Sequence, residues 1–85
     1  MIEKVPVHVR VIALNVEHNY LIPRQMCAAE AAELIYKTLL EEYPGIRQHS
    51  GMKGMLLQQS TGLVLDPGCS FQQLGIHQGE RLYYV

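Results

Sequence analysis

The residues best placed for chemistry are Cys27 and Glu30, three positions apart at the start of a segment rich in Ala, Leu and Glu. A thiol at a helix N-terminus can become a nucleophile. The same spacing is that of a capping box with Cys in place of Ser or Thr, in which the side chains only satisfy backbone groups. No His or basic residue adjoins Cys27, and Cys69 lies beside a turn. We therefore expect two unreactive thiols, free and at least partly buried.

The other candidate groups do not form a recognisable site. The histidines show no ligand-like spacing such as an i, i+4 pair, and the glycines form neither a P-loop nor a dinucleotide fingerprint. They are His8, His18, His49 and His77, and Gly51, Gly54, Gly62, Gly68, Gly75 and Gly79. Glu41 and Glu42 lie at the unfavourable end of a helix dipole, which solvated acids tolerate at small cost. We predict no catalytic residue, no metal site and no cofactor, and hence no enzyme.

The length and the charge of the chain restrict its domain count and the classes of partner that it can bind. Eighty-five residues suffice for one domain, residues 1–85, with a single core. Seven basic residues are scattered among eight acidic ones, whereas nucleic-acid binding requires clustered positive charge. No apolar run approaches the roughly 20 residues of a membrane span, and the first residues lack the features of a secretory signal. We expect a cytoplasmic chain that binds other proteins, with no nucleic-acid partner and no direct membrane insertion.

The first half of the chain predicts a strand, a second strand and a long helix. Val5, Val7, Val9 and Val11 alternate with other residues, the period of a half-buried strand. Pro6 cannot donate to a ladder, so pairing there is one-sided or begins just after it. A polar turn at 15–19 leads to a short returning strand at 20–23.

Residues 27–43 lack Gly and Pro and have high helix propensity. One apolar stripe must face the sheet, formed by Ala28, Ala31, Ala32, Ile35 and Leu39. Pro44 and Gly45 end the helix, and 47–53 forms a polar loop.

The second half predicts short strands joined by turns. Strands at 55–59 and 63–65 flank a turn at 60–62, and Asp66-Pro67-Gly68 is a second turn. Ser70 is a helix cap and Gly75 suits the left-handed end of a one-turn helix. A last strand runs from 81 to 85.

This order resembles the ubiquitin-like (β-grasp) superfamily over almost the whole chain. The resembling features are apolar anchors placed before, between and after the two turns of the second half, namely Leu56, Leu57, Leu63, Phe71, Leu74, Ile76 and Leu82. The resemblance implies an α+β fold with a mixed four- or five-stranded sheet and one central helix packed on one face.

Within that superfamily the chain looks most like the YukD/EsaB group of bacterial proteins associated with type VII (WXG100) secretion. The features are Leu21-Ile22-Pro23 before the helix and the ending from Leu74-Gly75-Ile76 to Leu82. This implies an accessory or regulatory role among secretion-system components. The same features suit the ubiquitin-like subunit of multicomponent monooxygenases, which stays an alternative. A protein modifier or sulfur carrier is a third, expected only if the native chain continues past Val85 to a Gly-Gly tail.

Strand parity predicts the binding surface. Leu56 and Leu57 cannot face the same side, nor can Tyr83 and Tyr84. If Leu56, Leu82 and Tyr84 face the helix, an exposed partner-binding patch forms on the other side from Leu57, Gln59, Tyr83 and Val85. Single exposed apolar residues are also ordinary, and the exposed helix face around Glu33 and Lys37 is the alternative surface.

Overall fold

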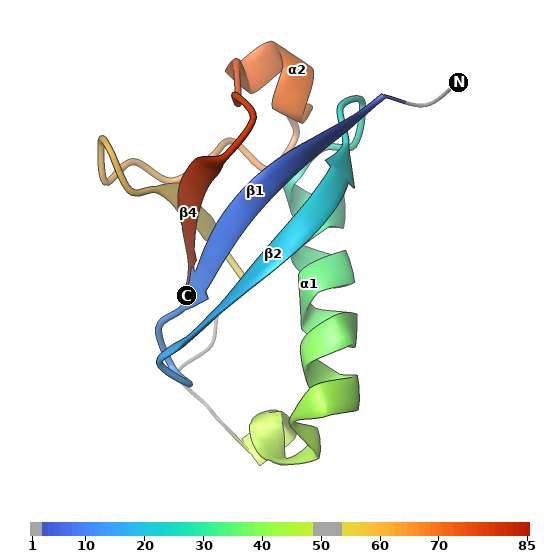
Figure 1. The fold of residues 1–85 in the computed structure, drawn as a ribbon, viewed down its shortest axis with the longest axis vertical. Helices are drawn as coiled ribbons and strands as arrows, with labels where there is room; N and C mark the ends of the chain where they lie inside the picture. The colour runs from blue at the N-terminus through green and yellow to red at the C-terminus, as the bar shows by residue number, and fades with distance from the viewer. Residues whose placement is uncertain (1–2, 49–53) are drawn as a thin grey trace.

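The structure is a computed structural model that describes residues 3–48 and 54–85, and these form a mixed sheet with one long helix across a single face. The elements are β1 (Lys4–Val11), β2 (Val16–Pro23), α1 (Ala28–Glu42), η1 (Pro44–Gln48), β3 (Leu56–Gln58), α2 (Phe71–Leu74) and β4 (Glu80–Tyr84). The strand order of the four-stranded sheet is β2-β1-β4-β3, with β1 central and parallel to β4 (Figure 1). The other two pairs are antiparallel. The predicted α+β arrangement, with one helix packed on one face, is confirmed.

Strand β1 holds the sheet together, and Pro6 sits where its missing N–H costs least. The amide of Arg24 donates to the carbonyl of Glu3 at 2.8 Å. Because hydrogen-bonded pairs alternate along an antiparallel ladder, the Pro6–Leu21 pair falls at a non-hydrogen-bonded position. The nitrogen of Pro6 therefore faces β4, where parallel pairing begins only at Val7. Pairing thus starts just after the proline on that side, as predicted.

The first turn differs from the sequence prediction. Residues 15–19 were expected to form it, but the turn lies at 12–15 and β2 begins at Val16. Asn15 has φ 54°, a left-handed conformation that Asn tolerates better than most residues. The turn therefore begins three residues earlier than expected, and β2 begins four residues earlier. The alternate residues from Val16 to Ile22 then face α1 and the rest face solvent.

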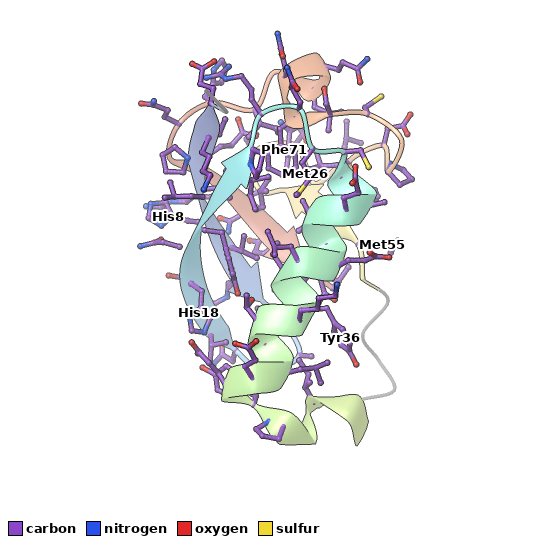
Figure 2. The ribbon with its side chains drawn as sticks, turned by 90° about the vertical axis from the view of Figure 1, so that its right-hand side faces the viewer. His8, His18, Met26, Tyr36, Met55 and Phe71 are labelled. Atoms are coloured by element: carbon purple, nitrogen blue, oxygen red, sulfur yellow. The ribbon has the colours of Figure 1, made fainter. Side chains whose placement is uncertain are left out.

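Helix α1 buries the predicted stripe against the sheet. Ala28, Ala31, Ala32, Ile35 and Leu39 are all buried together with the four valines of β1. Figure 2 shows α1 in front of the strands, with Tyr36 on one of its flanks and Met26 and Phe71 beyond its N-terminal end. Tyr43 ends the helix just before Pro44, and the chain continues as η1, a 3₁₀ turn that the sequence did not predict.

The second half corrects one predicted strand and confirms one cap. Residues 63–65 were expected to be a strand but make only an isolated bridge, between Val64 and Leu57, because β3 itself is three residues long. The predicted one-turn helix is present as α2. Ser70 accepts a hydrogen bond from the Gln73 amide at 3.1 Å. Gly75 ends the helix with φ 68°, which favours glycine.

Candidate functional site

The sheet has one face covered by α1 and one that is not, which we call the outer face. Leu56, Leu82 and Tyr84 point toward α1 and are at most 2% exposed. The burial pattern confirms the predicted sorting of the strands, since Leu57, Gln59, Tyr83 and Val85 are only partly buried. The predicted exposed patch is therefore half-buried, and within it Leu57 and Tyr83 are direct cross-strand partners. Whether they bind a partner stays a prediction.

An apolar row crosses the outer face. Leu57 pairs with Tyr83 on one side and with Val64 on the other. Cross-strand partners lie on the same face within about 5.5 Å, so the three side chains form a continuous strip that we call the apolar row. Val64 is 52% exposed. Sequence reasoning placed Val64 in a strand without giving it a face, because its partner in the sheet was unknown.

Polar groups extend this row toward β2. Arg10 pairs with Tyr83 in the parallel ladder and with Glu17 in the antiparallel one. Its guanidinium reaches the Glu17 carboxylate, Nη1 to Oε1, at 3.2 Å. It also donates to the side chain of Asn15. The positive charge of Arg10 is therefore offset by Glu17 within the sheet. The side chain of Arg10 lies next to that of Tyr83, its partner in β4.

A second row of side chains lies beside the apolar row, two residues further along each strand, and we call it the cationic row. Its members are Arg81, His8 and Lys4. Arg81 of β4 pairs with His8 of β1, and Lys4 lies further along β1 on the same face. Figure 2 shows His8 on the side of the sheet away from α1. No acidic side chain in 3–48 or 54–85 forms an ion pair with His8, Lys4 or Arg81. The charges of Lys4 and Arg81 are therefore not offset by an acidic side chain among the described residues.

Gln59 borders the cationic row but is partly engaged within the sheet. Its amide N–H donates to the carbonyl of Arg81 at 3.1 Å. Its side-chain Nε2 donates to the carbonyl of Leu82 at 3.4 Å. The side-chain oxygen of Gln59 is the atom still suited to a partner.

The opposite surface of the molecule is acidic. The exposed residues of α1 include Glu30, Glu33, Glu41 and Glu42, with Lys37 as the basic one. The two surfaces thus differ in net charge, because Lys4, Arg10 and Arg81 lie on the outer face with Glu17, whereas four acidic residues lie on the exposed side of α1 with Lys37. Such a charge separation orients an approaching charged partner before contact.

The structure agrees with the expectation that both thiols are free and partly buried. Both cysteines are free and partly buried. The thiol of Cys27 donates to Glu30 Oε1 at 3.1 Å, and the Cys27 amide points to the same oxygen at 3.5 Å, the contacts of a capping box. Desolvation, followed by the nearby Asp66 carboxylate, raises the pKa of the Cys69 thiol. A raised pKa lowers the thiolate fraction and disfavours nucleophilic chemistry.

One polar cluster joins β2 to the end of α1. His18 Nε2 lies 3.2 Å from the Tyr43 hydroxyl and 3.6 Å from Glu42 Oε2. Thr38 donates to the hydroxyl of Tyr20 at 3.2 Å. Burial raises the pKa of Tyr20, and the Thr38 hydrogen bond partly offsets this. The cluster contains one histidine and no converging set of ligands, and its contacts tie two elements together.

In 3–48 and 54–85 no group of three or more His, Cys, Asp or Glu side chains could hold a metal ion. His49 and Gly51 lie outside the described residues. No described helix has the length and apolar character needed to cross a membrane.

Known proteins that resemble this chain are found by their structure and not by their sequence. No protein-family model matches the sequence, and no curated protein matches it either. The chain is similar to the N-terminal ubiquitin-like domain of the 4931431F19Rik protein, with a TM-score of 0.72 and 18% identity over 100% of this chain and 76% of that one.

Two further solved structures are similar. The ubiquitin-like domain of an Arabidopsis thaliana protein has a TM-score of 0.69 at 12% identity, over 99% of this chain and 78% of that chain. A chain of phenol hydroxylase from Pseudomonas sp. OX1 has a TM-score of 0.72 at 13% identity, over 96% and 72%. At such identities the similarity shows a shared fold.

Proposed function

We propose that this chain, which has the ubiquitin-like β-grasp fold, is a non-catalytic module that binds another protein through the outer face of its sheet. The observation that carries the proposal is the apolar row of Val64, Leu57 and Tyr83 lying directly beside the cationic row. An apolar centre with a polar rim is the usual composition of a protein interface. Tyrosine suits its centre, since the ring buries a large area while the hydroxyl stays hydrated.

The charges of the outer face favour an acidic partner with aliphatic side chains. Arg81, His8 and Lys4 would meet carboxylates, and the apolar row would meet the aliphatic groups. The acidic outer side of α1 repels the same partner and so restricts it to the sheet. Gln59, with its free side-chain oxygen, and Val85, beside the row, complete the proposed contact set.

In the cell we propose an accessory or regulatory role in a type VII secretion system, on the cytoplasmic side. The support is the resemblance to the YukD/EsaB group in Leu21-Ile22-Pro23 and in the ending around Leu74-Gly75-Ile76. A second candidate is the ubiquitin-like subunit of a multicomponent monooxygenase. The similarity to a chain of a phenol hydroxylase favours that alternative. Genes neighbouring the one for this chain, whether for secretion components or for oxygenase subunits, would separate the two roles.

The test compares partner capture by the wild type and by a face variant. Leu57→Ser together with Tyr83→Ser removes the centre of the apolar row. The matched control is Glu33→Ala together with Lys37→Ala on the exposed helix face. Each purified protein captures partners from the source cell, which quantitative mass spectrometry identifies. We expect one or a few proteins that bind the wild type and the control but are depleted by the face variant.

Calorimetry with the purified partner then gives the affinity. Loss of two central residues should weaken binding by about 2 kcal/mol or more, roughly 30-fold. The variant must keep a cooperative melt close to that of the wild type. If it binds normally while the helix control fails, the functional surface is the α1 face and the proposal is wrong.

A further inference from the structure

An apolar pocket opens around the β3 edge, next to the apolar row. It has a volume of about 100 Å³, and its lining includes Ala28, Ala29, Met55, Val64, Leu65 and Pro67. Val64 belongs both to this lining and to the apolar row. The exposed Val64 is thus the point at which the apolar row on the outer face and the pocket lining meet.

The walls of the pocket are held by backbone hydrogen bonds. The first amides of α1 donate to the loop that precedes α2. Ala28 N donates to the carbonyl of Cys69 at 3.0 Å, and Ala29 N donates to the carbonyl of Pro67 at 3.1 Å. On the other wall, Leu65 N donates to the carbonyl of Leu56 at 2.8 Å. A site built this way is largely preformed, so an occupant does not have to order it.

Size and chemistry define the occupant. Among the residues that the structure describes, none with a charged side chain lines the pocket, which disfavours a charged group that would be desolvated there. A dry cavity of about 150 Å³ accommodates a benzene ring, so about 100 Å³ is better matched to four or five aliphatic carbon atoms. The small side chains of Ala28 and Ala29 leave this space on the helix side.

We infer that the pocket receives a single leucine or methionine side chain from the protein that docks on the outer face. This inference rests on the proposed function for its partner and adds to it an anchoring position. Interfaces concentrate their affinity in a few such buried anchors.

The first test needs no partner. N-acetyl-leucine methylamide is titrated into protein carrying ¹³C-labelled methyl groups, with N-acetyl-alanine methylamide as the matched small probe. We expect saturable shifts of the Val64, Leu65 and Met55 methyl signals with the leucine probe, at a Kd in the millimolar range, and none with the alanine probe. Absence of a saturable shift would overturn the inference.

A filled-pocket variant gives the second test. Ala29 is exposed on α1, and Ala29→Leu places an aliphatic side chain at the pocket mouth with little loss of helix propensity. Glu33→Leu, one turn further along the exposed side, is the control. We expect Ala29→Leu to abolish the probe shifts and to weaken partner binding at least tenfold, and the control to retain both. Unchanged shifts in a folded Ala29→Leu protein would contradict the assigned pocket.

The outcomes separate the two proposals. If the Leu57 and Tyr83 double variant loses the partner while Ala29→Leu binds normally, the outer face functions as proposed and the pocket inference fails. If Ala29→Leu weakens binding and the double variant does not, the pocket is an anchor and the proposed outer-face function fails.

Discussion

Replacing Ile35 by Ala tests the packing of α1 on the sheet. Ile35 is fully buried in the middle of the helix stripe. The substitution deletes three carbon atoms, worth about 0.8 kcal/mol each in transfer free energy, or about 2.4 kcal/mol together. Ala31 and Ala32, one turn earlier on the same stripe, have no rotamers with which to fill the space. A cavity contribution therefore adds to the transfer loss, and we expect a total of about 3–4 kcal/mol, within the usual range of about 2–5.

Urea unfolding monitored by helical circular dichroism measures this loss. A chain of 85 residues has an expected stability of about 4–13 kcal/mol. With a slope of about 1 kcal/mol per molar urea, the midpoint should fall by about 3 M at an unchanged slope. Ile35→Val removes one methyl group and should cost about 0.5–1.5 kcal/mol, which keeps the measurement possible if the alanine variant is unfolded. Lys37→Ala, on the exposed side of the helix, is the control.

A loss below about 0.5 kcal/mol for Ile35→Ala would refute the reasoning. It would mean that Ile35 does not pack against the sheet and that the phase of the helix is wrong. Because alanine has the highest helix propensity, Lys37→Ala should lose little stability, and an equal loss there would show that the effect does not depend on burial.

Three further predictions concern single residues. Burial raises the pKa of Tyr84 above its usual range, so the contribution of this hydroxyl to stability is present below about pH 10 and is lost as the pH rises through the folded-state pKa. Between pH 9 and pH 11 the urea midpoint of Tyr84→Phe should therefore fall less than that of the wild type. An equal fall in the two proteins would be contrary evidence. The amide of Asn19 faces the edge of β2 that no described strand covers, so Asn19→Pro should cost about 1 kcal/mol or less. His18→Pro breaks a hydrogen bond of the β1–β2 ladder and should cost about 3 kcal/mol or more. Thermal melts that reverse this order would reject the assigned hydrogen-bonding pattern of the ladder. Gly75→Ala should cost about 1–2 kcal/mol because φ is 68° there, and a neutral effect on the urea midpoint would show that the cap conformation relaxes.

The sequence alone was sufficient for the elements whose signals are local. The alternation of Val5 to Val11, the stripe from Ala28 to Leu39 and the Ser70 cap each depend on near neighbours in the chain, and all are present in the structure. Strand parity also sorted Leu56 from Leu57 and Tyr83 from Tyr84, because side chains alternate whatever the strand pairs with. The α+β class followed from the order of these elements.

Only the tertiary structure decided which residues meet. The length of β2 and the single bridge at Val64 depend on what each segment pairs with, and local propensity does not contain that information. Arg81 and His8 are more than 70 positions apart in the sequence, and the parallel β1–β4 register brings them together. The cationic row, and the pocket that shares Val64 with the apolar row, exist for the same reason: they are built from cross-strand and helix-to-loop contacts between distant parts of the chain.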